Sequence, residues 1–135
     1  MLVSLIRATN GHDLDAIVDC FSPNYRNETP VHPTRGFVGG DQVRRNWQQI
    51  LTSVPDVAIE VTRFVVGGDT IWSEMEMRGT RRDGSQHLMR GVVIFGVSGG
   101  RAEWASFYME PVQEIDGDVN EAVKNAISPQ TEAKP

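Results

Sequence analysis

The stretch that decides the fold is VAIEVTRFVVGGDTIWSEMEMRGTRRDGSQHLMRGVVIFGVSGGRAEWASFYMEPV, residues 57–112. Apolar and polar residues alternate along it, and glycine-containing turns interrupt it at 67–69, 82–84 and 98–100. A period of two is typical of strands that turn one face to a core, and short glycine-containing turns join antiparallel neighbours. We therefore predict four strands in an antiparallel meander, at 57–66, 70–80, 86–97 and 101–112.

The first part of the chain shows helical periodicity instead. Short helices are predicted over residues 2–9 and from Asp13, which can cap the second helix. A third helix is predicted from Asp41 to the residues before Pro55, with Trp47 on its apolar side. Helices followed by a meander predict an α+β domain in which three N-terminal helices pack on one face of a strongly curved sheet.

The size and charge of the chain narrow the function classes. The chain has 135 residues and a net charge of −5, which favours one compact domain and argues against a nucleic-acid partner. No apolar run approaches the roughly 20 residues that span a bilayer, and a signal-peptide pattern is missing, so we expect a cytoplasmic protein without membrane contact. Residues 113–135 form a tail outside the domain at 1–112, and a capping-box pattern at 118–121 predicts a short helix there.

A polar segment between the second and third predicted helices is the first candidate for a functional site. Residues 25–33 read Tyr-Arg-Asn-Glu-Thr-Pro-Val-His-Pro. On a strand, Tyr25 and Asn27 would share one face, and polar side chains toward a core are costly unless the core holds a pocket. We therefore predict that both residues line a pocket. His32, between two prolines, is either a residue at its mouth or a surface histidine.

A second polar pattern lies in the strand predicted at 70–80. Alternation puts Trp72, Glu74 and Glu76 on one face. If this face looks into a cavity, the two carboxylates repel each other and one pKa rises toward a value useful for acid–base catalysis. In most antiparallel sheets such a face is exposed to solvent, and the pattern leaves both interpretations open. The three histidines show no spacing typical of metal ligands, so we expect no metal and no cofactor.

The last two predicted strands are apolar on both faces, at 91–95 and 104–109. The predicted helices can cover one face only. A second copy of the chain that packs sheet on sheet would cover the other face, which predicts a homodimer.

The order of elements and four motifs resemble the nuclear transport factor 2-like superfamily and, within it, the SnoaL-like branch. The motifs are Tyr-x-Asn at 25–27, Gly-Phe-Val-Gly at 36–39, Val-Arg-Arg-Asn-Trp at 43–47 and Trp-x-x-x-Tyr-Met-Glu-Pro at 104–111. That branch includes polyketide cyclases and is related to ketosteroid isomerases and limonene epoxide hydrolase. The resemblance covers about residues 1–112 and implies a cone-shaped, mostly apolar pocket.

The resemblance also implies roles for individual residues. In the epoxide hydrolases a Tyr-x-Asn pair and an aspartate on the final strand hold a water, and an Arg-x-Asp pair completes the site. Tyr25 and Asn27 match the first pair, and Glu74 and Glu76 stand at the positions of the second. Phe107 occupies the position of the final aspartate, so the resemblance implies an altered active site.

Our leading hypothesis is a small-molecule enzyme of the cyclase, isomerase or hydratase/hydrolase type, which uses acid–base catalysis on an oxygenated hydrophobic substrate. The alternative is a non-catalytic ligand-binding or dimeric interaction module of the same fold. Glu76 would be the general acid or base, tuned by Glu74. The predicted catalytic residues are Glu76, Tyr25, Asn27, Glu74 and His32, and the predicted substrate-binding residues are Trp47, Trp72, Phe107 and Met109.

Overall fold

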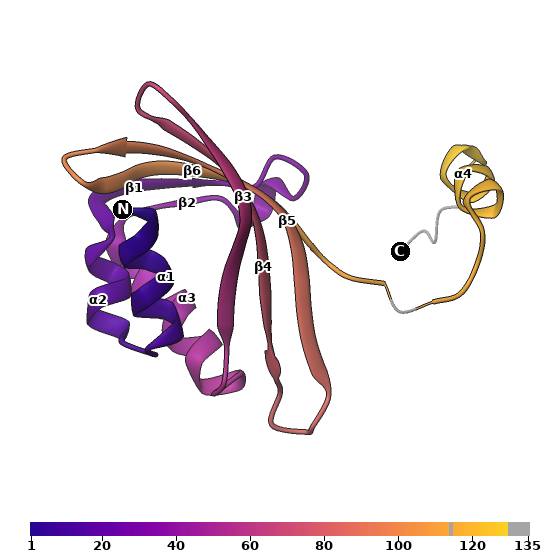
Figure 1. The fold of residues 1–135 in the computed structure, drawn as a ribbon, viewed down its shortest axis with the longest axis horizontal. Coiled ribbons are helices and arrows are strands. Elements are labelled where there is room, and N and C mark those ends of the chain that lie inside the picture. The colour runs from indigo at the N-terminus through magenta and orange to yellow at the C-terminus, as the bar shows by residue number, and fades with distance from the viewer. Residues whose placement is uncertain (114, 130–135) are drawn as a thin grey trace.

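The computed structural model describes residues 1–113 and 115–129 (Figure 1). Along the described chain the elements are α1 (Leu2–Asn10), α2 (Leu14–Asp19), β1 (Phe21–Glu28), the short 3-10 helix η1 (Pro33–Arg35), β2 (Phe37–Val38), α3 (Gly40–Ser53), β3 (Ala58–Gly67), β4 (Thr70–Thr80), β5 (Gln86–Ser98), β6 (Arg101–Pro111) and α4 (Val119–Ile127).

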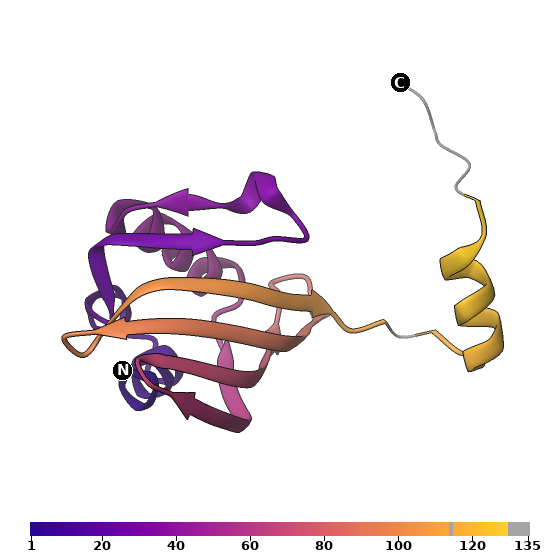
Figure 2. The ribbon, with the colours of Figure 1, turned by 90° about the horizontal axis from the view of Figure 1, so that it is seen from above.

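The strands form one six-stranded sheet in the order β2-β1-β6-β5-β4-β3. Strands β3 to β6 make the predicted antiparallel meander, and β1 lies parallel to β6. Helices α1, α2 and α3 gather on one side of the bent sheet, which we call the inner face (Figures 1 and 2). The prediction of an α+β domain with three N-terminal helices on a curved mixed sheet is therefore confirmed.

The polar strand β1 differs from its prediction. It begins at Phe21 instead of Tyr25, because Phe21 already pairs with Ala102 of β6. The two-residue strand β2, which pairs with β1 at Asn27 and Phe37, was not predicted, because two residues carry too little periodicity to be recognised.

Two side chains fix the ends of the N-terminal helices. Asp13 caps α2 as predicted, since its Oδ1 accepts a hydrogen bond of 3.1 Å from the amide of Ala16. Asn10, at the end of α1, binds both backbone groups of Ile59 on β3 at 3.1 and 2.8 Å. This second contact ties the helices to the edge of the sheet, above a core that includes Ile17.

The close approach of β5 and β6 requires glycine at two positions. A Cβ on Gly91 would lie 2.0 Å from the carbonyl oxygen of Tyr108, and one on Gly96 would lie 1.9 Å from the indole nitrogen of Trp104. Both strands are long and cross the bend of the sheet (Figure 1). The absence of side chains there lets the sheet wrap around the inner face.

Helix α4 stands apart from the rest of the chain (Figure 1). Asp118 caps it by accepting a hydrogen bond of 2.8 Å from the amide of Glu121. Its apolar residues Val119, Val123 and Ile127 are exposed. Within the described residues, the helices lack the length and apolar character needed to cross a membrane.

Candidate functional site

A pocket of about 320 Å³ lies on the inner face, between the sheet, β2 and α3. Five of the residues that sequence analysis singled out line it. They are Tyr25 and Asn27 on β1, Trp47 on α3, and Phe107 and Met109 on β6. The structure therefore brings together one polar pair and three apolar side chains from separate parts of the chain.

Tyr25 and Asn27 form the polar pair at one wall of the pocket. The hydroxyl of Tyr25 donates a hydrogen bond of 2.8 Å to Oδ1 of Asn27. The ring of Tyr25 is 1% exposed and makes edge contacts with Phe21 and Phe37, at centroid distances of 4.8 and 6.0 Å. Burial, with a smaller contribution from the charge of Glu28, raises the pKa of the Tyr25 phenol. The hydroxyl therefore stays protonated and remains a donor.

The rest of the wall is mainly apolar. Met77 on β4 and Met89 on β5 are register partners and line the pocket beside Met109 and Phe107. Trp47 faces them from α3. Flexible methionines and aromatic rings of this kind suit a hydrophobic ligand. Contact of Trp47, Phe107 and Met109 with a substrate stays a prediction.

The predicted carboxylates Glu74 and Glu76 do not line the pocket. Met75 and Met77 on the same strand turn toward the helices, so their even-numbered neighbours point to the opposite face, which we call the outer face. Trp72 lies there too and is 53% exposed. The prediction that these three residues belong to the pocket is wrong.

Arginines neutralise both carboxylates on the outer face. Glu74 accepts hydrogen bonds from Arg63 at 3.0 Å, and Glu76 accepts one from Arg90 at 2.6 Å and another from Arg78. These bonds lower the pKa of each carboxyl group, the opposite of the shift that acid–base catalysis needs. Glu76 therefore lacks the raised pKa that its predicted role as general acid or base requires.

His32 also lies outside the pocket. Its Nε2 is 2.5 Å from a carboxylate oxygen of Glu110, whose neighbour Met109 points into the pocket. Alternation along β6 puts Glu110 on the outer face. The mouth position predicted for His32 is wrong, and the alternative, a surface histidine, agrees with the structure.

The comparison with known families fits this geometry. Residues 2–104 match the family of the SnoaL-like domain. The chain belongs to this family. No curated protein matches the sequence significantly.

Solved structures share the fold of this SnoaL-like domain. An epoxide hydrolase of the LEH-like type from M. tuberculosis is 14% identical, with a TM-score of 0.69 over 81% of this chain and 79% of that one. SalBIII, an epoxide hydrolase/cyclase-like enzyme of pyran ring formation in the polyether salinomycin, is 21% identical, with a TM-score of 0.71 over 81% and 87%. A protein of ketosteroid isomerase-like fold from Catenulispora acidiphila, in complex with trimethylamine, is 13% identical, with a TM-score of 0.69 over 79% and 83%. At these identities the likeness shows a common fold.

Sequence analysis missed four polar residues of the pocket, which are Thr29, Arg35, Asn46 and His87. The signal for His87 was its position two residues before Met89, which puts both side chains on the same face of β5. Asn46 directly precedes Trp47 in the motif at 43–47. Thr29 lies two residues after Asn27, so alternation along the strand also points to it, whereas Arg35 belongs to the irregular segment after Pro33, for which periodicity makes no prediction.

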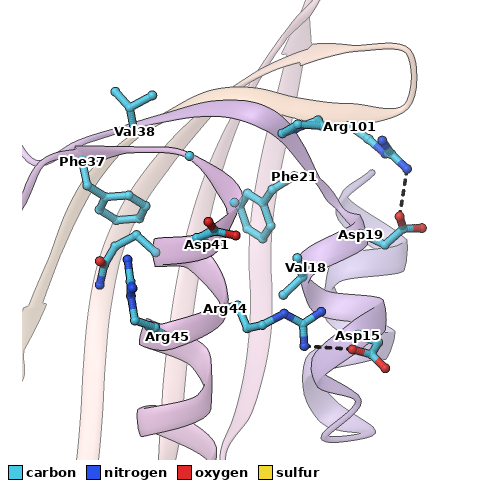
Figure 3. A pocket seen from close by; sticks show the side chains of 14 residues that line it. Asp15, Val18, Asp19, Phe21, Phe37, Val38, Asp41, Arg44, Arg45 and Arg101 are labelled. Carbon is cyan, nitrogen blue, oxygen red and sulfur yellow. Dashed lines mark hydrogen bonds and ion pairs between the residues drawn. The ribbon is translucent and has the colours of Figure 1, made fainter.

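A larger and more polar hollow of about 680 Å³ lies next to the pocket, between α2, β1, β2 and the start of α3 (Figure 3). Four of its charged residues form two ion pairs: Arg44 binds Asp15 at 2.9 Å and Arg101 binds Asp19 at 2.8 Å. These side chains are solvent-exposed, so water screens their charges and competes with a ligand for them. We therefore place the candidate site in the smaller apolar pocket.

Proposed function

We propose that this SnoaL-like domain binds a small, largely apolar molecule through one of its oxygen atoms and acts on it as a cofactor-independent enzyme. The hydrogen bond from Tyr25 to Asn27 carries this proposal. Because Oδ1 of Asn27 is engaged, its Nδ2 hydrogens are available to an acceptor on a ligand. An apolar pocket with a few oriented polar groups is typical of small-molecule sites.

The chemistry follows from the donors that the pocket offers. A hydrogen bond from the Asn27 amide to a carbonyl or epoxide oxygen stabilises the negative charge that develops there during ring opening, cyclisation or isomerisation. The buried phenol of Tyr25 supports this by holding the amide in place. Epoxide hydrolysis and pyran ring formation by enzymes of the same fold are in keeping with such chemistry.

A second candidate function is ligand binding without chemistry. It is favoured by one observation, that within residues 1–113 and 115–129 the pocket is lined by neither aspartate nor glutamate. Phe107 stands where a catalytic aspartate was expected from the resemblance. A pocket of this kind can hold a ligand without a strong base to abstract its proton.

Compounds built on the indane skeleton separate the two candidates. We expect 1-indanone to shift the side-chain amide signals of Asn27 in NMR spectra and to bind more tightly than indane, which lacks the oxygen. With indene oxide, the epoxide of the same skeleton, the enzyme hypothesis predicts ring opening above the uncatalysed rate. Binding without turnover would favour the second candidate, and equal affinity for indane and 1-indanone would contradict the proposed oxygen contact.

We also propose that two copies pair through their outer faces. Val65 and Trp72 lie side by side there as register partners and are exposed, Ile94 pairs with Trp72 and is itself buried, and Tyr108 is exposed on β6. The neighbouring charges of the outer face form ion pairs within the chain. A second copy related by a two-fold axis would present the same apolar strip to this one.

A further inference from the structure

Three polar side chains of the pocket share an arrangement that goes beyond the Tyr25–Asn27 pair. In each, the hydrogen-bond acceptor is already engaged by a donor from the protein. Tyr25 donates to Oδ1 of Asn27 at 2.8 Å, Gln42 donates to Oδ1 of Asn46 at 2.8 Å, and Arg81 approaches Nδ1 of His87 at 3.4 Å. Each side chain keeps an N–H group for a ligand: the Nδ2 hydrogens of the two asparagines, whose oxygens already accept one hydrogen bond, and the second ring nitrogen of His87.

Arg81 determines which hydrogen His87 carries. A guanidinium group has donors only, so Nδ1 of His87 must present its lone pair, and the ring hydrogen lies on Nε2. Arg81 is held in place by the hairpin itself, since its Nη1 donates to the carbonyl of Gln86 at 2.6 Å and to the hydroxyl of Ser85 at 3.2 Å. His87 is therefore oriented as a donor before any ligand arrives.

The surroundings of His87 also keep it neutral. Burial, and then the positive charge of Arg81, lower the pKa of the imidazole. The other charged groups of this region bind elsewhere: Arg82 donates to the carbonyl of Thr52, Asp83 accepts from Ser85, and Asp56 accepts from the amide of Thr80. Near neutral pH the pocket thus receives a neutral N–H donor from β5.

On α3, Gln42 orients the side chain of Asn46 in the same way. Gln42 and Asn46 are four residues apart and lie on the same side of the helix. The amide of Gln42 donates to Oδ1 of Asn46. The Nδ2 hydrogens of Asn46 remain for a ligand, beside the pocket wall formed by Trp47. Arg35, which also lines the pocket, adds a positive charge and further donors.

We infer that this pocket selects hydrogen-bond acceptors and anions and rejects cations, with Asn46 and His87 as specificity-determining contacts and Gln42 and Arg81 as positioning residues. This inference rests on the proposed function and names the ligand class: an apolar molecule that carries a carbonyl or carboxylate group instead of an amine. A bound ammonium group would lose its water beside these N–H donors and the positive charge of Arg35, and the two hydroxyl oxygens of Tyr25 and Thr29 replace only part of that water, which makes the cation costly to bury.

A series on one skeleton tests the selectivity. We expect indane-1-carboxylate and 1-indanone to bind about tenfold more tightly than 1-aminoindane, which is a cation at neutral pH. Asn46→Leu and His87→Phe should each reduce the advantage of 1-indanone over indane about fivefold. Gln48→Leu, an exposed change on the same helix, should leave it unaltered.

The role of Arg81 has a readout that needs no ligand. In protein labelled with ¹⁵N-histidine, NMR distinguishes the two tautomers of His87 and measures its pKa. Arg81→Met should raise this pKa and allow a hydrogen on Nδ1, and Arg81→Lys, which keeps a donor and a charge, should restore the wild-type tautomer. A wild-type His87 with its hydrogen on Nδ1 at neutral pH would overturn the inference, whatever the ligands do.

Different results would contradict the selectivity of the pocket and its proposed small-molecule function. If 1-aminoindane binds as tightly as 1-indanone, the selectivity is wrong while the proposed small-molecule function stands. If none of the four compounds binds, indane included, the proposed function is contradicted, and the inference that rests on it falls too.

Discussion

The hydroxyl of Tyr25 and Oδ1 of Asn27 are 2.8 Å apart, on two side chains that the same strand turns toward one pocket. Strand geometry alone brings residues i and i+2 to the same face. The hydrogen bond then orients the amide of Asn27, because it engages Oδ1 and leaves the Nδ2 hydrogens to a ligand. The candidate site is thus organised by local structure before packing adds its apolar walls.

The first prediction concerns this hydrogen bond. Tyr25→Phe keeps the ring in its contacts with Phe21 and Phe37 but leaves Oδ1 of Asn27 without its donor. We expect the free energy of unfolding to fall by about 1 kcal/mol, measured by urea denaturation. Tyr108→Phe is the matched control, since Tyr108 is 42% exposed on the outer face, and it should change stability little. Equal effects of the two substitutions would contradict the structural role of the buried hydroxyl.

The second prediction concerns the bend of the sheet. Gly91→Ala places a Cβ 2.0 Å from a backbone oxygen of β6, which cannot move away without disturbing the strand pairing. We expect a loss of about 3 kcal/mol in the free energy of unfolding. Gly67→Ala, also in a strand, has open space around the new Cβ and should cost far less. A Gly91→Ala protein as stable as Gly67→Ala would show that the strands do not approach as described.

The third prediction separates the carboxylate of the outer face from the pocket. Glu76→Gln should lower stability at neutral pH, because Arg78 and Arg90 lose their charged partner, and should leave the affinity for 1-indanone unchanged. The arginines lower the pKa of Glu76 from its usual 4.5, so its stabilising effect is present above pH 4.5 and is lost as the pH falls through the lower folded-state pKa.

Urea denaturation at several pH values checks this dependence. The difference in stability between the wild type and Glu76→Gln should be constant near neutral pH and shrink below pH 4.5. Glu103→Gln, at an exposed position of β6, serves as the control. Loss of ligand binding in Glu76→Gln alone would return this residue to the site.

The fourth prediction concerns the homodimer. Trp72→Glu places a charge in the apolar strip of the outer face and should convert a dimer to a monomer, as followed by sedimentation velocity. Val3→Glu introduces the same charge at an exposed position of α1 and should leave the dimer intact. A wild-type protein that sediments as a monomer at micromolar concentration would contradict the proposed pairing.

Features set by neighbouring residues could be predicted from the sequence, whereas features set by packing between distant segments could not. Period-two alternation correctly grouped Trp72 with Glu74 and Glu76, because it depends on the strand alone. Whether this group faces the helices depends on packing between distant segments. Both choices were compatible with the sequence, and the carboxylates proved to face outward. Likewise, alternation relates His87 to Met89, but the donor from Arg81 that defines its chemistry is visible only in the hairpin.

The most direct test of the proposed function is the affinity of Asn27→Asp for 1-indanone, measured by NMR titration. The substitution keeps the size of the side chain but replaces its N–H donors with a carboxylate, which repels a carbonyl oxygen. We predict about tenfold weaker binding than in the wild type, with indane unaffected, and no change for Asn24→Asp, an exposed control on the same strand. Equal affinity of the wild type and Asn27→Asp for 1-indanone would contradict the proposal.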